Sequence, residues 1–451
     1  MSRDLTGTLA DWQRRFGDVV HLRIWPEHMI VVTDPQLVRD LLVTRHDTLI
    51  RWERGIRVFA QVHGHSVLVS EGEAWRTKRH ALQPGFTPKA VQAFVPTIAG
   101  ATAAVLARWP AHDSRWPIES ALTSLAMDVI LRLMFPEEIG DDARAAEHAV
   151  RTVGAAANAE FYAHVNLPGW MSGKRGRRGK RGKREALAVL DGLIDRHVRS
   201  RLAKSEDAWP DDLLSRLLRL HREDGQTWPM LAVRDECMTT FLAGHETLSA
   251  TLAWWAWCMA SNPRAQASAR AEVARVLNGA APAADQLASL GYLRQTIEET
   301  MRLYPAAPVL ITRRTTKPAV LGSWQMPART MFMLPVQLMH RDPRWFAQPE
   351  VFRPERFAPD APPVPRGAYL PFGTGPRVCL GQHLAMTEMT VVAAMLLQRF
   401  ALSVPAGMAP PRPVMNVTLR PDQPMHLDIG NVEAVAQREF VDASADRSRG
   451  D

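Results

Sequence analysis

The chain has 451 residues with 46% hydrophobic content, enough to bury a sizeable core, although a prior from length alone would suggest roughly three domains. Its three cysteines, Cys237, Cys258 and Cys379, lack the paired spacing of a disulfide framework or a zinc site, so a reducing cytoplasm is expected. The net charge of +8 is compatible with anionic partners. No nucleic-acid module is found, and aromatic residues are not interleaved with basic ones, so nucleic-acid binding is not expected.

The N-terminus does not combine a basic start, an apolar centre and a small-residue cleavage site, so no secretion signal is predicted. Residues 1–16 instead predict an amphipathic helix. The most apolar segment, residues 248–260, is shorter than the roughly 18 residues that a transmembrane helix needs. We therefore expect a cytoplasmic protein that is soluble or at most peripheral to a membrane.

In chain order, the first elements are a β-hairpin and a short helix. Residues 19–24 and 29–33 are β-rich runs separated by Trp25-Pro26-Glu27-His28, which favours a hairpin. Asp34 and Pro35 supply the N-cap and the first residue of the next helix.

Helical patterns dominate the rest of the chain. Strand-like segments return only between residues 309 and 335 and after residue 401, so the predicted fold class is mainly α with small β-sheets at one side. There is no internal repeat, and residues 441–451 predict a disordered tail. The predicted helices cover residues 88–109, 118–134, 142–157, 184–202, 209–221, 231–261, 265–277, 292–303 and 380–400.

A glycine-framed loop carries one cysteine just before an apolar helical segment: Phe372-Gly-Thr-Gly375-Pro-Arg377-Val-Cys379-Leu-Gly381. Gly375 can adopt a positive φ in a tight turn, and Gly381 leaves room for a flat cofactor close to the backbone. The dipole of the following helix and the charge of Arg377 would stabilise a Cys379 thiolate. A lone cysteine is more often an inert buried side chain, but this setting predicts a metal ligand.

The pattern Phe-x-x-Gly-x-Arg-x-Cys-x-Gly resembles the haem-binding loop of the cytochrome P450 superfamily, and all five specified positions match. The resemblance extends over most of the chain and implies one P450 domain of the soluble bacterial type over residues 1–440. It implies haem b between a long oxygen-binding helix and the helix after the cysteine loop. Cys379 would be the proximal iron ligand, whose electron donation favours cleavage of the O–O bond of dioxygen, and Phe372, Arg377 and Gly381 would contact the haem.

Glu299 and Arg302 lie three residues apart and face each other on one helical surface. Taken alone, such a pair is most often a solvated ion pair worth at most about 1 kcal/mol. Because Leu-Tyr-Pro follows, the pair resembles the Glu-x-x-Arg of P450s, with Arg356 as the third member. The resemblance implies a buried network that holds the cysteine loop. Its role would be structural, and Arg302→Lys should fail because the planar guanidinium fork would be lost.

Residues 241–247, Phe-Leu-Ala-Gly-His-Glu-Thr, lie inside the long helix predicted from residue 231 to residue 261. Glycine lowers helix stability by roughly 1 kcal/mol relative to alanine, so Gly244 indicates either a close approach by a ligand or a local opening of the helix. The segment resembles the Ala-Gly-x-x-Thr of the P450 oxygen-binding helix. Ala243 and Gly244 would then contact the haem, and Thr247 and Glu246 would organise water for proton delivery.

The segment allows two other interpretations. Glu246 could instead support its neighbours or serve as an internal salt-bridge partner, because buried acids are so often paired. The sequence His245-Glu246 could suggest a zinc hydrolase, but Ser249 stands where that pattern needs a second histidine, so zinc is not supported.

Haem carries two propionates, which call for basic or indole N–H donors elsewhere in the chain. Trp75 and Arg79 resemble the family's Trp-x-x-x-Arg helix, whose side chains meet a propionate. Arg313 or the adjacent Arg314 lies where the family places another propionate ligand, and the sequence does not distinguish the two. Either arginine could also be an ordinary residue at a strand edge.

Residues 174–184 form a strongly basic run with three interspersed glycines. The simplest interpretation is a solvated flexible loop, because like charges repel. The alternative is peripheral contact with anionic lipid or with an acidic carrier. No reductase module is fused to the chain, so we expect a separate electron donor of the ferredoxin or flavodoxin type. It would dock near Cys379, where Arg366, Arg377 and His383 could meet an acidic protein.

The resemblance also identifies positions that would line the substrate pocket, all of them apolar, so a hydrophobic small molecule is expected. We therefore predict a monomeric haem-thiolate monooxygenase that uses O₂ and external electrons. The alternatives are a peroxide-driven peroxygenase or isomerase, which would not need the proton relay, and a non-catalytic haem sensor. The pocket positions are Phe241, Leu242, Ala243, Ala307, Val309, Leu310 and Val417.

Overall fold

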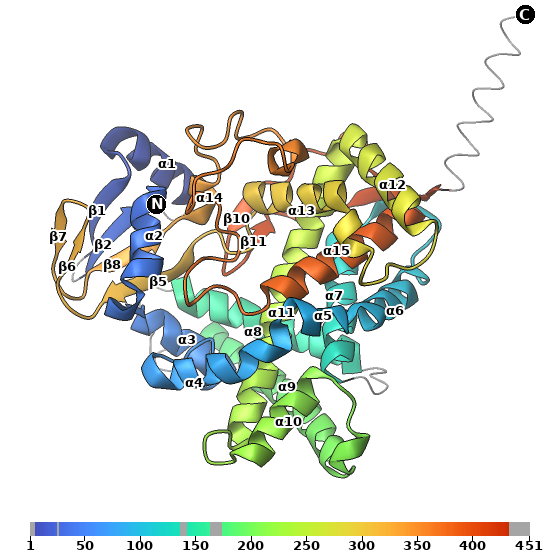
Figure 1. Ribbon diagram of the computed structural model, residues 1–451, viewed down its shortest axis with the longest axis horizontal. Helices are drawn as coiled ribbons and strands as arrows, with labels where there is room; N and C mark the ends of the chain where they lie inside the picture. The colour runs from blue at the N-terminus through green and yellow to red at the C-terminus, as the bar shows by residue number, and fades with distance from the viewer. Residues whose placement is uncertain (1–4, 25–26, 136–141, 163–173, 433–451) are drawn as a thin grey trace, which may run out of the picture.

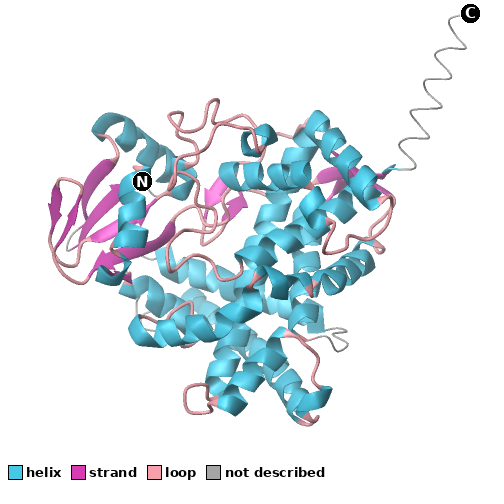
Figure 2. Cartoon of the chain, viewed as in Figure 1, coloured by secondary structure: helices cyan, strands magenta, loops and turns pink. Residues whose placement is uncertain are grey.

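The computed structural model describes residues 5–24, 27–135, 142–162 and 174–432. Helices form most of the structure, and the largest sheet lies at one side, as Figures 1 and 2 show. The prediction of a mainly α fold with small sheets is therefore confirmed. The tail predicted at residues 441–451 lies outside the described residues.

The largest sheet has five strands in the order β1-β2-β8-β5-β3 and joins segments that are far apart in the sequence. The predicted hairpin is present, with β1 and β2 antiparallel, while β2 pairs in parallel with β8. Alternate residues of β2 and β8 belong to a buried cluster with helix α2, against which Leu310 of β5 packs. The strands are β1 (Val19–Ile24), β2 (Glu27–Val32), β3 (Leu49–Arg51), β5 (Leu310–Thr315) and β8 (Met331–Leu334).

Two helices flank this sheet near the N-terminus. Helix α1 (Leu5–Phe16) buries Leu9 against a cluster that includes Val20 and Leu338. Helix α2 (Pro35–Arg39) begins where predicted, because the Asp34 carboxylate accepts a hydrogen bond of 2.8 Å from the Leu37 N–H and caps the first turn.

Helix α11 (Met230–Ser261) runs through the centre of the helical region and is buried on nearly all sides in its second half. It packs against α7 (Ile118–Met134), whose bounds match the prediction. A helix that is apolar all round belongs in the interior of a large protein. The remaining helices are α3 (Glu53–His63), α4 (Gly72–Leu82), α5 (Pro88–Gln92), α6 (Val95–Leu106), α8 (Asp142–Tyr162), α9 (Lys174–Leu202), α10 (Leu213–Glu223), α12 (Pro263–Leu277), α13 (Gly291–Leu303), α14 (Val336–Met339) and α15 (Gln382–Arg399).

Smaller sheets complete the fold. Strands β4, β12 and β9 form a three-stranded sheet, and β6 with β7 and β10 with β11 form two hairpins. None of the described helices has both the length and the apolar character needed to cross a bilayer. The remaining strands are β4 (His112–Trp116), β6 (Ala319–Leu321), β7 (Trp324–Met326), β9 (Phe400–Ser403), β10 (Pro413–Met415), β11 (Leu419–Pro421) and β12 (Leu427–Asn431).

Several predicted boundaries were wrong. The helix predicted at residues 88–109 is split into α5 and α6, because Pro96 in the first turn of α6 has no N–H to continue a preceding helix. Helix α10 begins after Asp212, which caps it by accepting the Ser215 N–H at 2.7 Å, rather than at Trp209. Helix α8 continues beyond Ala157 to Tyr162, and α3 was not predicted.

The largest difference concerns the basic run at residues 174–184. It is helical from Lys174 onward, as the first part of α9, rather than a loop that precedes a helix at Arg184. Lys183 is only 5% exposed, and its ammonium lies 3.0 Å from Glu160 Oε1 on α8 and 2.8 Å from Gln61 Oε1 on α3. One charge of the run is therefore neutralised by a buried contact that the local sequence does not reveal.

Candidate active site

A cavity of about 1470 Å³ lies between α11, the loop that precedes α15, and the large sheet. Most of the site residues predicted from the sequence contribute to its wall. Among the residues predicted to contact haem or substrate, the exception is Phe241, whose side chain is 2% exposed and belongs to the hydrophobic core. The predicted residues that line the cavity are Trp75, Arg79, Leu242, Ala243, Gly244, Glu246, Thr247, Ala307, Val309, Leu310, Arg313, Phe372, Arg377, Cys379, Gly381 and Val417.

The cysteine loop has the tight geometry that its glycines suggest. Gly375 has a φ of +75°, and a Cβ at this position would lie 2.1 Å from the carbonyl oxygen of Leu42, so only glycine fits. The Cys379 N–H donates a hydrogen bond of 2.9 Å to the carbonyl of Phe372, which closes the loop. By contrast, no protein atom lies within 4 Å of a Cβ built at Gly381, which faces the cavity.

Cys379 lies deep in the protein, with its side chain exposed to the cavity. Burial raises the pKa of its thiol, while a hydrogen bond from the Gly381 backbone and the charge of Arg79 lower it. The predicted effect of Arg377 is not found, since its guanidinium turns toward the Ser70 carbonyl and the Glu71 carboxylate. A thiol in such surroundings ionises readily only when it binds a metal cation, as in haem-thiolate ligation.

Three arginines gather around one carboxylate at the edge of the cavity. Arg51 Nε lies 2.7 Å from Glu71 Oε1, and Arg377 pairs with the other carboxylate oxygen. Arg51 and Arg313 are directly opposite each other on β3 and β5, an arrangement that is unfavourable for like charges. Burial, followed by the charge of Arg51, lowers the pKa of Arg313 to about 10 and that of Arg377 to about 9.

This arginine cluster, Arg51, Arg313 and Arg377, therefore carries more positive charge than Glu71 can neutralise. Among the described residues, Glu71 is the one acidic side chain that forms ion pairs with the cluster. A flat cofactor with two carboxylates would supply the missing counter-charges, so the residues present fit haem and its propionates. Arg51 and Glu71 were missed by sequence reasoning, because their proximity depends on strand pairing and a loop.

The structure also separates the two candidate arginines of β5. Arg314 is buried and pairs with Glu27 at 2.7 Å and with Glu53 at 3.1 Å. Arg313 has no carboxylate partner among the described residues and belongs to the arginine cluster. On the neighbouring helix α4, Arg79 donates to the Val378 carbonyl at 2.9 Å, and Trp75 lies under the Arg377 guanidinium, 3.9 Å from it.

On the opposite side of the cavity, α11 presents small residues. Ala243, Gly244 and Thr247 face the cavity along one side of the helix, and the Thr247 hydroxyl donates to the Ala243 carbonyl at 2.7 Å. The helix is continuous here, so the expected local opening is not seen. A Cβ at Gly244 would lie 3.1 Å from Ile130 Cδ1, which shows that glycine permits close packing against α7.

Glu246 is held at the edge of the cavity by residues near β11. Its Oε1 accepts a hydrogen bond of 3.0 Å from Thr418, and Arg420 lies 3.9 Å away. The interpretation as an internal ion-pair partner therefore has structural support, although the side chain also lines the cavity. Phe241 is absent from the cavity wall because its side chain packs into the hydrophobic core that α11 shares with α7.

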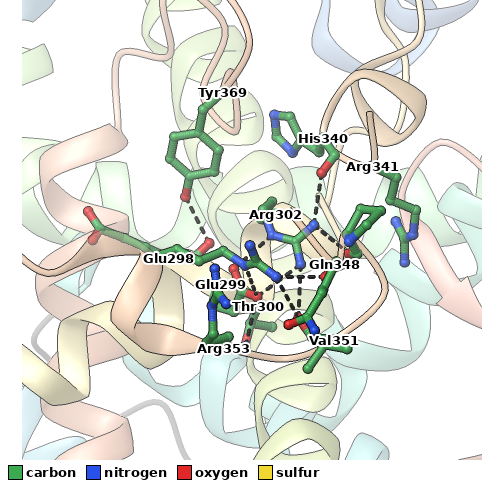
Figure 3. Close-up of polar contacts among 12 residues, drawn as sticks. Glu298, Glu299, Thr300, Arg302, His340, Arg341, Gln348, Val351, Arg353 and Tyr369 are labelled. Carbon is green, nitrogen blue, oxygen red and sulfur yellow. Dashed lines mark hydrogen bonds and ion pairs between the residues drawn. The ribbon is translucent and has the colours of Figure 1, made fainter. Parts of the chain in front are cut away.

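Glu299, Arg302 and Arg356 form a buried network, and Figure 3 shows Glu299 and Arg302 within it. The Glu299 carboxylate accepts two hydrogen bonds from Arg302, at 2.7 and 2.9 Å, and one from Arg356 at 3.1 Å. Both Glu299 and Arg302 are completely buried, which excludes the interpretation as a solvated surface pair. Arg302 also donates to the backbone carbonyls of His340 and Pro349.

This network reaches the segment that leads into the cysteine loop. The Leu370 N–H donates to His340 Nε2 at 2.8 Å, and the Tyr369 hydroxyl donates to the Glu298 carbonyl at 2.9 Å. Both contacts lie within three residues of Phe372. The network can therefore fix the position from which the loop departs.

Of the residues expected to meet a redox partner, Arg366 and His383 are exposed, whereas Arg377 is turned inward toward Glu71. In the basic run of α9, Arg181 and Arg184 are exposed and Lys183 is buried. The side chains of residues 174–178 lie outside the description.

Comparisons with known proteins agree on one family. The family model described as cytochrome P450 matches residues 3–428. Cyclooctat-9-en-7-ol 5-monooxygenase of Streptomyces melanosporofaciens is 32% identical to this chain, covering 91% of it and 88% of the relative. Putative cytochrome P450 132 of Mycobacterium bovis is 28% identical, covering 92% and 90%. The fold is also that of the cytochrome P450DA heme domain, with a TM-score of 0.84 at 22% identity, covering 95% of this chain and 93% of that one. The chain therefore belongs to the cytochrome P450 family, as a monooxygenase.

Proposed function

We propose that the cavity holds haem b, with Cys379 as a ligand of its iron and the arginine cluster around Glu71 as the site of the two propionates. The observation that carries this proposal is the excess of buried positive charge beside a cavity-facing cysteine. Phe372 and Gly381 would contact the ring on the cysteine side, and Ala243 and Gly244 would contact it on the side of α11. Trp75, Arg79, Arg313 and Arg377 would surround the propionate edge.

Bound haem would supply the activation of O₂. With electrons from the separate donor and protons from the relay, one oxygen atom would enter the substrate and the other would leave as water. Thr247 and Glu246 are the residues that we assign to proton delivery. The Thr247 hydroxyl faces the cavity and can pass its hydrogen bond from the Ala243 carbonyl to a water molecule. Glu246, held by Thr418, would connect that water to the polar edge of the cavity.

The substrate is proposed to be a hydrophobic small molecule, because the pocket residues Leu242, Ala307, Val309, Leu310 and Val417 are all apolar and line the cavity. The name of one relative refers to cyclooctat-9-en-7-ol, so cyclic terpenoid alcohols are the first compounds to test. Fatty acids and other natural-product intermediates would form the second group of compounds.

Electrons are proposed to come from a separate protein of the ferredoxin or flavodoxin type, delivered to a monomer. Arg366 and His383 are exposed and flank the cysteine loop in sequence. An acidic donor would bind there by charge attraction, and its binding would weaken as ionic strength rises. Arg377, engaged with Glu71, is not assigned to this surface.

The proposal is tested by the absorption spectrum of the dithionite-reduced protein under CO, with and without Cys379→Ser. We expect a Soret band at about 450 nm that is lost in the variant. A band at about 420 nm in folded wild-type protein would contradict thiolate ligation. Thr247→Ala should then consume reductant with less product and more peroxide; product formation from peroxide alone, unaffected by this variant, would favour the peroxygenase alternative.

A further inference from the structure

A hydroxyl group on α11 faces the cavity without a hydrogen-bond partner among the described residues. Thr240 is half-buried and lines the cavity. It lies four residues, about 6 Å along the helix axis, before Gly244. Two other threonines of this helix that line the cavity, Thr247 and Thr251, donate to the carbonyl four residues earlier, and the Thr239 hydroxyl pairs with His63. Thr240 does not, so its donor remains available to a ligand.

A neutral imidazole lies beside this turn. His63, the last residue of α3, is 8% exposed and lines the cavity. Its Nδ1 lies 3.1 Å from the hydroxyl of Thr239, and within the described part of the chain Nε2 has no partner. Burial lowers the pKa of His63 to about 4, so the ring is uncharged at neutral pH. Whichever tautomer is present, Nε2 can pair with a hydroxyl, which both donates and accepts.

The position of His63 is fixed by α11 itself. The carboxylate of Asp235 accepts the His65 N–H at 2.7 Å, and that of Glu236 accepts the Val67 N–H at 2.9 Å. Gly64 turns the chain with a φ of +54° directly against the Asp235 carboxylate. These contacts hold the end of α3, which bears His63, against α11, which bears Thr240.

The charged residue nearest to Thr240 in the sequence, Glu236, already has an ion-pair partner. Glu236, which also lines the cavity, is paired with Lys78 at 2.9 Å. Around it, Phe59, Val62 and Leu242 add apolar surface. The polar atoms of Thr240 and His63 are themselves uncharged, and they suit a neutral oxygen rather than a carboxylate or an ammonium group.

We propose that Thr240 and His63 form a polar anchor that binds a hydroxyl or keto oxygen of an otherwise apolar, uncharged substrate. This inference rests on the proposed function, since it assigns the substrate of the same cavity. The polar anchor lies about one turn of α11 from the Ala243–Gly244 surface, so it selects which carbon of a rigid substrate faces the site of oxidation. It would act in both binding and regioselectivity.

The test compares adamantane, 1-adamantanol and 2-adamantanone, which share one rigid skeleton and differ in a single oxygen. Binding to the holoprotein is measured by headspace gas chromatography of the free compound, a readout that does not depend on haem spin state. The ratio of alcohol affinity to hydrocarbon affinity should fall about three- to tenfold in Thr240→Val and in His63→Phe, as expected for one lost hydrogen bond. Thr240→Ser keeps the hydroxyl, so its affinity ratio should be close to that of wild type.

Thr251→Val is the matched control, because that hydroxyl is already bound to the Thr247 carbonyl, and its affinity ratio should equal the wild-type ratio. The proposal is overturned if the ratio stays within about twofold of wild type in both Thr240→Val and His63→Phe. The CO spectrum of each variant is recorded in parallel. If wild-type protein shows no band at about 450 nm, the haem-thiolate proposal is rejected. If that band is present but the affinity ratios of both variants equal the wild-type ratio, the polar anchor alone is rejected.

Discussion

Lys183 directs its ammonium group to the carboxylate of Glu160, 3.0 Å away, although it belongs to a run of basic residues that resembles a solvated loop. The same ammonium also donates to Gln61 at 2.8 Å, so one side chain joins α9 to α8 and α3. Helices α3 and α8 both line the cavity. This contact therefore couples the order of the basic helix to the shape of the pocket.

Replacing Lys183 with methionine should destabilise the protein by about 1–3 kcal/mol, because Glu160 would keep a partly buried charge without its partner. Urea unfolding followed by circular dichroism measures the change. Arg181→Met removes a charge from the same run at an exposed position and should leave the midpoint unchanged. Equal effects of the two variants would show that total charge, rather than the buried contact, governs stability.

Arg302→Lys should destabilise the protein by about 3 kcal/mol or more, because lysine cannot reproduce the two parallel bonds to Glu299 and the bonds to the His340 and Pro349 carbonyls. The fraction of protein that shows the band at about 450 nm should fall with it, since the network leads into the cysteine loop. Retention of wild-type stability and spectrum in this variant would contradict the structural role.

Gly375→Ala should displace the cysteine loop, because the added Cβ would lie 2.1 Å from the Leu42 carbonyl oxygen at a φ of +75°. We expect a loss of about 2 kcal/mol or more and reduced haem content, measured by unfolding and by the pyridine haemochrome assay. Gly100→Ala, on an exposed face of α6 with no atom within 4 Å of the new Cβ, is the control and should stabilise slightly. An unchanged Gly375→Ala protein would show that the loop can move aside.

The stability of the protein should fall as pH decreases below 6.5, in part through His340. Burial lowers the pKa of this residue to about 3, and its Nε2 accepts the Leu370 N–H, which requires the neutral ring. Between pH 6.5 and about 3 the unfolded chain binds a proton that the folded protein does not bind, so folding loses stability as pH falls. Between pH 7.5 and 5.5 the contribution of His340 should be about 1 kcal/mol.

His340→Gln should be less stable than wild type at pH 7.5 but lose less stability on acidification to pH 5.5, measured by urea midpoints at both pH values. An acid sensitivity equal to that of wild type would mean that other groups account for the effect. The change in stability between the two pH values is compared for each protein, so the part of the destabilisation by the substitution that does not depend on pH cancels.

The parts of the fold and site that could be predicted from the sequence depend on short-range patterns. The spacing around Cys379 and the long apolar runs of α7 and α11 are local, and they predicted the cysteine loop and those two helices closely. Phe241 was placed wrongly in the pocket because an apolar residue on a helix that is buried all round does not reveal which side faces a cavity. The predicted start of α9 was wrong because Glu160, the carboxylate that pairs with Lys183, lies on another helix.

Other residues could not be found because their role depends on contacts distant in the sequence. Arg51 and Glu71 meet Arg313 and Arg377 only after β3 pairs with β5 and the cysteine loop closes against Leu42. Nothing in the immediate neighbours of these residues indicates such a cluster. The choice of Arg313 over Arg314 as the proposed propionate ligand likewise depends on distant contacts, because Arg314 pairs with Glu27 and Glu53.

The pairing of Arg51 with Arg313 has a consequence for how the protein is made. The two strands that bear these arginines are separated by more than half of the chain, and β2 likewise pairs with β8, Met29 opposite Met331. Contacts of such long sequence separation form late, because closing the intervening loop costs entropy before any contact rewards it. During translation the arginine cluster therefore cannot assemble until residues beyond 377 have left the ribosome, and cofactor capture is expected to be essentially a post-translational step.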